Sequence, residues 1–557
     1  MCGIFSVLRL TGDARKNRQR VYQLAKRLRH RGPDSYGMEV REDASGRQTF
    51  MVHKRLAIVA PGESGNQPLF TDASKNIAFI ANGEIYNHQE LRDKFNIVSA
   101  NKSDCQVIGH LYEQHGTEFV KELDGMFAFV IEDRKNDTIV AARDHMGKIP
   151  MYMATGKDGS VWFSSEMKTL HDDPGVASYE IFPPGHIFIK KGDEPATMTR
   201  WYDPKWIMDE TYVPTKPADL VEIRETIVDA VTKRLMADVP YAVLLSGGLD
   251  SAVISSIIKP MLEETKQEYI TFTVGQEGSP DITAARMMSD FLGTKHHEYL
   301  FTSEEACSII PDVIYHLETY EPELIRSALP NYFLARLASQ HVKVVLTGEG
   351  SDELFAGYLY FRDAPDSAAI HKELRRIFHH LHNVNCQRAD RMTMAHGLEA
   401  RVPFLDPNVI DAVMQVDPEY KRIEGEEKPE KHALRALFDG EIPDPVLWRT
   451  KAMQCEGVGL NWVADLQTFC ESQVSDEDFA NSESLYPINP PQSKEEMYYR
   501  RLFESNYKNM DKFVHVWEGG CRAGGAAWQN EAYTRFGLKN VGQLAKGIDG
   551  VKGAPSA

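Results

Sequence analysis

The stretch YAVLLSGGLDSAV, residues 241–253, decides how the larger part of this chain folds. An apolar run with strand character ends at the turn 246–248, and a helix is expected to begin near Asp250 and Ser251. Glycines in such a turn let backbone N–H groups approach an anion, and the helix N-terminus adds about half a positive charge. The stretch therefore predicts a buried strand, a phosphate-binding turn and a helix.

The turn matches neither of two common nucleotide-binding patterns. It lacks the Lys-Ser/Thr ending of the P-loop and the G-x-G-x-x-G of dinucleotide folds. A tight turn without a ligand is the alternative. Against it stands a second turn, in VVLTGEGSDELFAGY at residues 344–358, where Gly348 and Gly350 also follow an apolar strand. Because the carboxyl ends of parallel strands share one edge, both turns are expected to form one site.

Acidic side chains accompany both turns. A carboxylate beside a polyphosphate normally needs a cation between them, and Mg²⁺ prefers a few carboxylates together with phosphate oxygens. Asp250 and Asp352 are therefore the candidates for holding Mg²⁺.

The sequence around the first turn alternates helices and strands. We expect helices at 220–236, 249–262 and 281–293, and strands at 241–248, 267–275 and 342–350. This alternation is typical of a parallel, doubly wound α/β layer. The region from His371 to Tyr507 is expected to be mostly helical and to pack over that layer. After Gly519 the chain becomes rich in Gly and Ala, and we expect part of this tail to be disordered.

The first 200 residues have a different pattern. Helix-like stretches at 20–30 and 103–116 interrupt strand-like runs, which lie at 50–59, 76–87, 125–133, 138–144 and 161–166. Strands grouped with few helices indicate an antiparallel α+β domain. An aperiodic stretch with several prolines near 201–220 is typical of a connector. We therefore predict domains at 1–205 and 206–520, followed by a tail at 521–557.

Composition narrows the class of protein. At 557 residues the chain is too long for one ordinary core. Its formal charge of -18 argues against a nucleic-acid partner. The seven cysteines show no paired metal-ligand spacing and no disulfide framework. No signal peptide or membrane span is recognisable, so we expect a cytoplasmic protein.

The N-terminus, MCGIFSVLRL at residues 1–10, carries a candidate nucleophile. A thiol has an unperturbed pKa of ~8.5 and an N-terminal amine one of ~7.7–8.0. If Met1 is removed, Cys2 supplies both a nucleophile and its base. The alternative is that Cys2 is a small residue at the start of a buried strand.

Several motifs together resemble known enzymes. SGGLDS resembles the pyrophosphate loop of ATP-pyrophosphatase-type synthetases, and MCGIF, RHRGPD, ANGEIYNH and SDCQVIGHLY resemble N-terminal-nucleophile glutaminases of class II. In this order, with GEGSDE and EARVPFLD downstream, the chain resembles the glutamine-dependent asparagine synthetase family over about residues 1–510. The resemblance implies an α/β multidomain fold, in which an α+β glutaminase sandwich precedes a doubly wound α/β ATP-pyrophosphatase domain.

The resemblance also implies a reaction. Glutamine is hydrolysed in the first domain, a carboxylate is adenylated by ATP in the second, and ammonia passes between them inside the protein. Cys2 becomes the nucleophile, and Asn82 and Gly83 become oxyanion donors, each worth ~3–4 kcal/mol of barrier. The implied glutamine-binding residues are Arg55, Ile58, Val59, Asn82, Glu84 and Asp104.

In the second domain the resemblance implies a nucleotide site with ATP and Mg²⁺ as cofactors. Its ATP-binding residues are Leu244, Ser246, Gly247, Gly248, Asp250, Ser251, Val274, Gly348 and Asp352. Glu349 would accept the proton that ammonium must lose before it attacks, and Lys451 would stabilise charge on the phosphates. Arg401 is interpreted as a structural ion-pair residue rather than a catalytic one.

Two segments depart from the family pattern. In ETYEPELIRSALP, residues 318–330, Glu323 and Leu324 replace an expected pair of hydroxyl residues, while Arg326 is kept. The run AMQCEG at 452–457, which includes Ala452, is also altered. We expect Glu323, Leu324 and Arg326 to contact the acceptor.

These departures leave the acceptor open. L-Aspartate is the expected acceptor, and a different carboxylate in a specialised pathway is the alternative. A β-lactam-forming relative is disfavoured because the residues expected to bind glutamine are all present. A catalytically inactive subunit is disfavoured because both sites keep their expected residues. The expected partners are small molecules, with neither nucleic acid nor membrane, and the sequence leaves a homodimer open.

Overall fold

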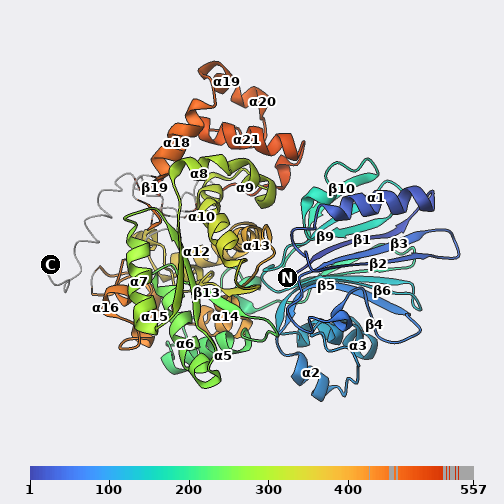
Figure 1. Ribbon diagram of the computed structural model, residues 1–557, viewed down its shortest axis with the longest axis horizontal. Helices are drawn as coiled ribbons and strands as arrows, with labels where there is room; N and C mark the ends of the chain where they lie inside the picture. Colours follow the sequence, from blue (N-terminus) through green and yellow to red (C-terminus); the bar gives the residue numbers. More distant parts are fainter. Residues whose placement is uncertain are drawn as a thin grey trace.

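The computed structural model describes residues 1–425, 427–450, 457–459 and 462–517, three single residues near the C-terminus (522, 526 and 528), and the backbone of two short strands after them. The described chain forms two bodies that lie side by side, with the N-terminus at the junction between them (Figure 1).

The N-terminal body is built on two antiparallel sheets. The strand order is β10-β8-β9-β1-β3-β2 in one sheet and β12-β11-β7-β6-β5-β4 in the other. The strands are β1 (Gly3–Leu10), β2 (Ser35–Glu42), β3 (Gln48–Arg55), β4 (Leu69–Phe70), β5 (Ile77–Ile85), β6 (Gly125–Asp133), β7 (Thr138–Arg143), β8 (Tyr152–Gly156), β9 (Val161–Ser164), β10 (Val176–Ile181), β11 (His186–Lys191) and β12 (Thr197–Arg200).

The two sheets pack face to face and are covered by helices on their outer faces. Buried residues such as Ile4, Ile80 and Val130 fill the space between the sheets. Helix α1 (Ala14–Lys26) covers the β1 sheet, and α2 (His88–Lys94) and α3 (Gln106–His115) cover the β5 sheet (Figure 1). The expected antiparallel α+β sandwich is confirmed. Helix α1 begins earlier than expected because the Asp13 side chain caps it, accepting from the Lys16 amide at 2.8 Å.

The second body contains a five-stranded parallel sheet in the order β15-β14-β13-β16-β17. Its strands are β13 (Tyr241–Leu244), β14 (Ile270–Gly275), β15 (Lys295–Leu300), β16 (Val344–Leu346) and β17 (Glu399–Arg401). The doubly wound α/β expectation is confirmed. The central strand β13 pairs with β14 on one side and β16 on the other, so the strand order reverses there, where such sheets bind ligands.

This body also contains helices, most of which surround the sheet. They are α5 (Leu220–Lys233), α6 (Leu249–Thr265), α7 (Pro280–Leu292), α8 (Ser303–Ser308), α9 (Ile310–Leu317), α10 (Pro322–Ala338), α11 (Ser351–Leu354), α12 (Ser367–His380), α13 (Asn385–Met394), α14 (Pro407–Met414), α15 (His432–Leu437), α16 (Asp444–Leu447), α18 (Trp462–Ser472), α19 (Asp476–Ala480), α20 (Ser482–Leu485) and α21 (Lys494–Asn506). The backbone of β18 (Tyr533–Thr534) and β19 (Gly537–Leu538) completes the described chain.

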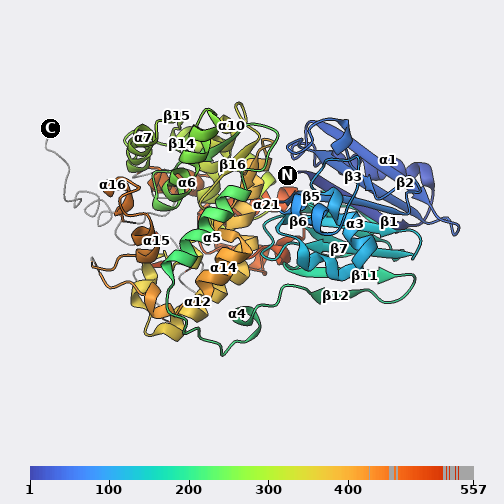
Figure 2. The same ribbon diagram turned by 90° about the horizontal axis from the view of Figure 1, so that it is seen from below.

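A connector containing the short helix α4 (Lys205–Met208) joins the two bodies. Figure 2 shows the chain running from β12 past α4 to α5. Trp206 is buried, and its ring packs edge-on against Phe378 with centroids 5.6 Å apart. Arg375 of α12 donates to the carbonyl of Ile207 at 3.1 Å. The connector is thus held against the second body by specific contacts.

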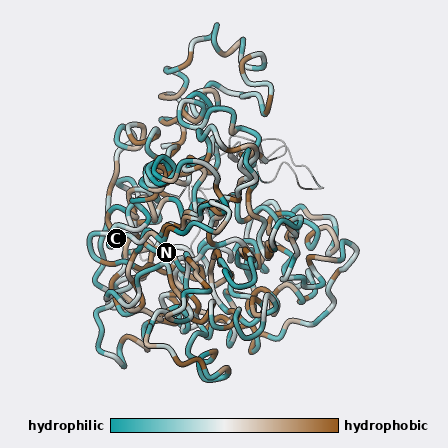
Figure 3. Tube along the Cα trace, turned by 90° about the vertical axis from the view of Figure 1, so that its right-hand side faces the viewer, coloured by the Kyte–Doolittle hydropathy of each residue, from teal (hydrophilic) through white to brown (hydrophobic). Residues whose placement is uncertain are grey.

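Helices α18 to α21 project from the second body, and hydrophobic and hydrophilic segments alternate along the projecting trace in Figure 3. Within the part of the chain that the structure describes, no helix combines the length and the apolar character needed to cross a membrane.

Candidate active sites

Cys2, the candidate nucleophile, directly precedes β1, next to the junction of the two bodies. The backbone N–H of Cys2 donates to Asn82 Oδ1 at 2.5 Å, and the thiol lies 3.7 Å from the carbonyl oxygen of Leu56. The amine of Met1 forms a buried ion pair with Glu399 of β17. Removal of Met1 would leave the Cys2 amine beside Asn82.

The surroundings of the thiol disfavour its ionised form. Burial raises the pKa of the Cys2 thiol, and the nearby amine of Met1 only partly opposes this. For the Met1 amine, burial lowers the pKa, but the Glu399 carboxylate outweighs it and holds the pKa above its usual value. A thiol with a raised pKa needs an adjacent base, which a free Cys2 amine would supply.

Both residues expected to stabilise an oxyanion lie on β5, close to Cys2. The Asn82 amide also donates through Nδ2 to Ser165 Oγ at 3.4 Å. Gly83 has φ +144°, and a Cβ there would lie 1.9 Å from the carbonyl oxygen of Met126. Only glycine fits at this position, because any side chain would collide with the backbone of β6.

Three of the residues expected to bind glutamine, Arg55, Ile58 and Val59, are close in sequence to Leu56, whose carbonyl oxygen the thiol contacts. Arg55 is buried, and its guanidinium donates to the carbonyl oxygen of Gly62 at 2.8 Å and to Asn66 Oδ1 at 3.1 Å. Ile58 and Val59 belong to the same loop, and the Val59 carbonyl accepts from Arg55 at 3.3 Å. Loop contacts therefore orient the guanidinium, while its contact with glutamine stays a prediction.

Two further expected residues, Glu84 and Asp104, bring their carboxylates close together. Asp104 Oδ2 accepts from the backbone N–H of Ile85 at 2.8 Å, which brings it beside Glu84. Burial, together with the charges of Glu399 and Asp104, raises the pKa of Glu84 well above its usual range. Two buried carboxylates at close range favour a cation between them, as the expected ammonium of glutamine would be.

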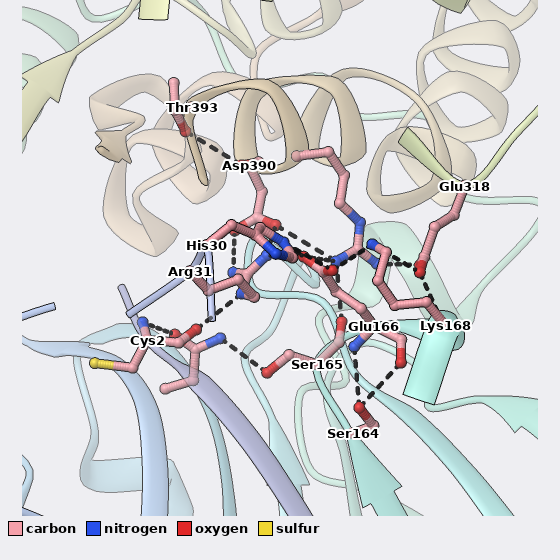
Figure 4. A network of polar contacts seen from close by, with 12 residues as sticks. Cys2, His30, Arg31, Ser164, Ser165, Glu166, Lys168, Glu318, Asp390 and Thr393 are labelled. Carbon is pink, nitrogen blue, oxygen red and sulfur yellow. Dashed lines mark hydrogen bonds and ion pairs between the residues drawn. The ribbon is translucent and has the colours of Figure 1, made fainter. Parts of the chain in front are cut away.

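A buried network of charges connects this site to the second body (Figure 4). Arg31 donates through Nε to the Cys2 carbonyl at 2.9 Å, and through its two terminal nitrogens to Asp390 of α13 at 2.7 and 2.8 Å. It also donates to Glu166 at 2.8 Å. Nothing in RHRGPD, residues 29–34, predicts this role of Arg31, because its partner Asp390 lies 359 residues away in the chain.

Glu318 contributes a second connection in the same network. Its carboxylate accepts from the backbone amides of Met167 and Lys168 at 2.9 and 2.8 Å, and from Arg391 at 3.0 Å. Lys168 also pairs with Glu166. The cations of this network, Arg31, Lys168 and Arg391, are each paired with a carboxylate, as buried ions require.

Arg401, interpreted as an ion-pair residue, is fully buried beside the same junction. It donates to Glu399 at 2.7 Å and to the carbonyl of Arg234 at 2.6 Å, and it lies 3.7 Å from Glu84. Glu399 thereby joins Arg401 to the Met1 amine.

The second site is a cavity of about 200 Å³ at the carboxyl edge of the parallel sheet. In the turn after β13, Ser246 N donates to Ser251 Oγ at 3.2 Å, and that hydroxyl donates to the Gly248 carbonyl at 3.0 Å. Helix α6 begins directly after Gly248, its N-cap residue. The turn and helix start have the arrangement expected of an anion-binding site.

Most of the expected nucleotide and acceptor residues line this one cavity. They are Leu244, Ser246, Gly248, Asp250, Ser251, Val274, Gly348, Glu349 and Asp352, together with Glu323 and Leu324. Gly247 is not among the lining residues. It adopts φ +74°, and its carbonyl accepts from Arg449 at 3.2 Å. Lys451 lies outside the described residues, as does nearly all of the altered run that follows it.

The two carboxylates expected to hold Mg²⁺, Asp250 and Asp352, both pair with the ammonium group of Lys431. Lys431 Nζ lies 2.6 Å from Asp250 Oδ1 and 2.7 Å from Asp352 Oδ1. Among the described residues, no group of three or more His, Cys, Asp or Glu side chains is arranged to hold a metal ion. A pair of carboxylates fits Mg²⁺ only when phosphate oxygens supply further ligands, as a bound nucleotide would.

Glu349, the expected proton acceptor, is held by residues of α13. Its carboxylate accepts from Arg388 at 2.6 Å and from Asn385 at 3.1 Å. Helix α13 also carries Asp390, the partner of Arg31. One helix therefore contacts the key acid of the second site and the arginine beside Cys2.

The expected acceptor residues divide between the cavity and the protein interior. Arg326 forms a buried ion pair with Glu495 of α21, with Nε 2.8 Å from Oε1, and it does not line the cavity. The N-terminus of α10 contributes Glu321 as well as Glu323. Burial and the charge of Glu323 raise the pKa of Glu321 to about 8.

Both bodies match known proteins along their length. Residues 1–181 match the model of the glutamine amidotransferase domain, and residues 222–369 and 362–530 match that of asparagine synthase. The fold and the two sites thus define a glutamine amidotransferase domain joined to an ATP-dependent synthetase domain.

Curated relatives extend over nearly the whole chain. Two similar proteins are named asparagine synthetase [glutamine-hydrolyzing]. The one from Sandersonia aurantiaca is 43% identical, and the match covers 94% of this chain and 98% of the relative. The one from Zea mays is 44% identical, and the match covers 90% of this chain and 86% of the relative. Asparagine synthetase [glutamine-hydrolyzing] 3 of Arabidopsis thaliana is 45% identical, covering 90% of this chain and 87% of the relative. The chain belongs to the asparagine synthase family.

Proposed function

We propose that this protein is a glutamine-hydrolysing, ATP-dependent synthetase that converts L-aspartate into asparagine. The observation that carries the proposal is the pairing of a thiol at the start of β1 with a nucleotide-type cavity, joined through the buried charges of Figure 4. The choice of L-aspartate as the acceptor rests on the names of its relatives.

In the first site, the thiolate of Cys2 attacks the side-chain amide of glutamine, and the free amine of Cys2 carries the thiol proton. Ammonia leaves, and water then hydrolyses the glutamyl thioester to glutamate. Gly83, and Asn82 after reorientation of its amide, would donate to the oxyanion. Arg55, Glu84 and Asp104 would hold the charged end of glutamine.

In the second site, the acceptor carboxylate attacks the α-phosphorus of ATP, and pyrophosphate leaves. The turn after β13 and the start of α6 bind phosphate oxygens, and Lys431 neutralises Asp250 and Asp352. Mg²⁺, held by these two carboxylates, would supply additional positive charge to the phosphates. Glu349 takes a proton from ammonium, ammonia attacks the acyl-adenylate, and AMP leaves.

The five described cysteines Cys2, Cys105, Cys307, Cys386 and Cys470 are unpaired and buried, which supports a reducing compartment such as the cytoplasm. An acceptor other than aspartate is the second candidate, and the Glu323 and Leu324 side chains in the cavity favour it.

The test is acceptor-dependent pyrophosphate release from ATP, with glutamine or ammonium as nitrogen source. We expect release with L-aspartate, and we expect Cys2→Ala to abolish only the glutamine-dependent product. Loss of the ammonium-dependent product in folded Cys2→Ala would refute the two-site assignment. Release with another carboxylate but not with aspartate would establish the second candidate.

A further inference from the structure

Two residues near the C-terminal end of the described chain line the cavity of the second body. They are Trp517 and Arg522, and Arg522 lies in the predicted tail at 521–557. Arg376 of α12 contacts both, because its guanidinium donates to the backbone carbonyl of Arg522 at 2.5 Å and lies 5.0 Å from the centre of the Trp517 ring. A charged side chain from the predicted tail therefore reaches the second site.

The Arg522 guanidinium fixes the orientation of one amide. Its Nη2 donates to Asn385 Oδ1 at 2.8 Å. The Nδ2 group of the same amide donates to Glu349 Oε2 at 3.1 Å and to Glu353 Oε1 at 3.0 Å. A guanidinium only donates hydrogen bonds, and an ionised carboxylate only accepts them. One orientation of the Asn385 amide therefore satisfies all three neighbours, and Arg522 supplies the donor for its oxygen.

The same guanidinium brings positive charge to Glu353. Its Nη1 lies 3.3 Å from Glu353 Oε1, and the Glu353 side chain is 1% exposed. Burial raises the pKa of Glu353 to about 7, and the charge of Arg522 is the largest influence that lowers it. Tyr358 donates its hydroxyl to Glu353, and its ring centre lies 4.5 Å from the Arg522 guanidinium. Arg522 is thus placed by an amide, a carboxylate and an aromatic ring together.

Three carboxylates follow β16 closely in the sequence, and each pairs with a different cation. The pairs are Asp352 with Lys431, Glu349 with Arg388, and Glu353 with Arg522. Loss of Arg522 keeps the first two pairs but removes the charge beside Glu353 and the donor to Asn385. A buried carboxylate without its counter-ion is costly, so Glu353 and the Asn385 amide are expected to rearrange. The contacts of Arg522 thus lead through Asn385 to Glu349 rather than to the phosphate turn after β13.

We propose that Arg522 is a positioning residue for the step after adenylation, in which ammonia attacks the acyl-adenylate. By fixing the Asn385 amide, it holds Glu349 where this carboxylate takes the proton from ammonium. The inference rests on the proposed function and adds to it a residue of the predicted tail. Without Arg522, ammonia forms slowly, and water cleaves the acyl-adenylate to the free acceptor and AMP. Pyrophosphate is then released without an amide product.

The test compares the pyrophosphate released with the asparagine formed, in the presence of ATP, L-aspartate and saturating ammonium. The wild-type enzyme should release one pyrophosphate for each asparagine. In Arg522→Ala the rate of asparagine formation should fall about tenfold or more, because proton transfer to Glu349 is impaired. Pyrophosphate release should fall less, so its ratio to asparagine should rise above one, and the KM for ATP should stay near its wild-type value. Guanidinium added at millimolar concentration should restore part of the asparagine formation.

The matched control is Arg501→Ala, which breaks an ion pair with Asp478 on the surface and removes no residue that lines the cavity. It should keep the ratio at one. Glutaminase activity and the melting temperature report folding. If Arg522→Ala does not fold, Arg522→Lys, which keeps the charge but loses the forked pair of donors, should show the raised ratio.

Three results would overturn the inference: near wild-type asparagine formation in the folded variant, a parallel loss of both products with the ratio still at one, or no recovery with guanidinium. Wild-type enzyme that releases no pyrophosphate with aspartate would instead refute the proposed function, and this role of Arg522 with it.

Discussion

Both terminal nitrogens of Arg31 donate to the carboxylate of Asp390, at 2.7 and 2.8 Å, while its Nε donates to the carbonyl of Cys2 at 2.9 Å. The peptide that carries the candidate nucleophile is thus oriented by an arginine that pairs both with Glu166 of its own body and with Asp390 of the synthetase body. Helix α13 provides Asp390 and also holds Glu349 through Arg388. The two sites therefore share α13 as a structural support.

The first prediction concerns this support. Asp390→Asn should lower glutaminase kcat/KM about tenfold or more, because Arg31 then keeps only Glu166 as a carboxylate partner and is expected to shift toward it, away from the Cys2 carbonyl. Ammonium-dependent synthesis should fall much less. Breaking a buried ion pair typically costs ~3–5 kcal/mol, so the melting temperature should also drop. Asp312→Asn, an exposed change on α9, is the control. Equal losses in both activities would contradict a specific effect on the Cys2 site.

The second prediction concerns the carboxylates that face Lys431. Asp352→Asn and Asp250→Asn should each abolish acceptor-dependent pyrophosphate release, since each removes a hard anionic ligand and a partner of Lys431. Basal glutaminase activity should persist. Magnesium titrations of pyrophosphate release, with the exposed change Asp439→Asn as control, check the assignment. Wild-type turnover and magnesium dependence in both variants would rule it out.

A third prediction follows from close packing beside the phosphate turn. A Cβ at Gly348 would lie 2.6 Å from the Cβ of Asp250, so Gly348→Ala must displace that side chain or the α6 start. The KM for ATP should rise at least tenfold while glutaminase is unaffected. Gly62→Ala, whose added methyl meets nothing within 4 Å, should leave ammonium-dependent synthesis at the wild-type level. Normal ATP affinity in Gly348→Ala would show that the turn is not the phosphate site.

The fourth prediction is a pH dependence. Burial and the charge of Glu323 raise the pKa of Glu321 to about 8, although Arg326 partly opposes this. Protonated Glu321 cannot attract an ammonium, so kcat/KM for aspartate should increase as pH rises toward about 8. In Glu321→Gln this increase should disappear. A pH profile that is the same in both proteins, after correction for stability, would remove Glu321 from acceptor recognition.

The same raised pKa affects stability, with a definite sign. A carboxyl whose pKa is higher in the folded protein than in the unfolded chain binds its proton more tightly in the folded state. Its contribution to the free energy of unfolding therefore falls as pH rises from the pKa of the unfolded chain toward about 8. Glu321→Gln should therefore lose less stability than the wild-type protein between pH 6 and 9, as thermal melts would measure.

Local sequence predicted the elements that carry the chemistry. Strands β6 and β13 and helix α6 lie where apolar runs and glycine turns indicated, because these patterns act over a few residues. The strands β15 and β17 were not anticipated. Strand β15 is polar and partly exposed, and β17 has only three residues, so neither has a periodic signal.

The sequence predicted the geometry of a site only where the residues of that site are neighbours in the chain. The turn after β13 contains its own ligand groups, and Asn82 and Gly83 are adjacent on β5. The acceptor role of Arg326 was implied by the family resemblance and stays a prediction, and its ion pair with Glu495 had no local signal because α21 reaches α10 only in the folded protein. Lys431 was not identified at all, since nothing in its local sequence points toward Asp250.

The sequence by itself determined which chemical groups this protein possesses: a thiol at the second residue, a glycine turn before a helix, and paired acids beside it. Only the tertiary structure decided which charges are neutralised, by Asp390 for Arg31, by Glu399 for the Met1 amine, and by Lys431 for Asp250 and Asp352. The physical reason is that burial makes an unpaired charge costly, and the partner that relieves this cost is chosen by packing between segments far apart in the chain.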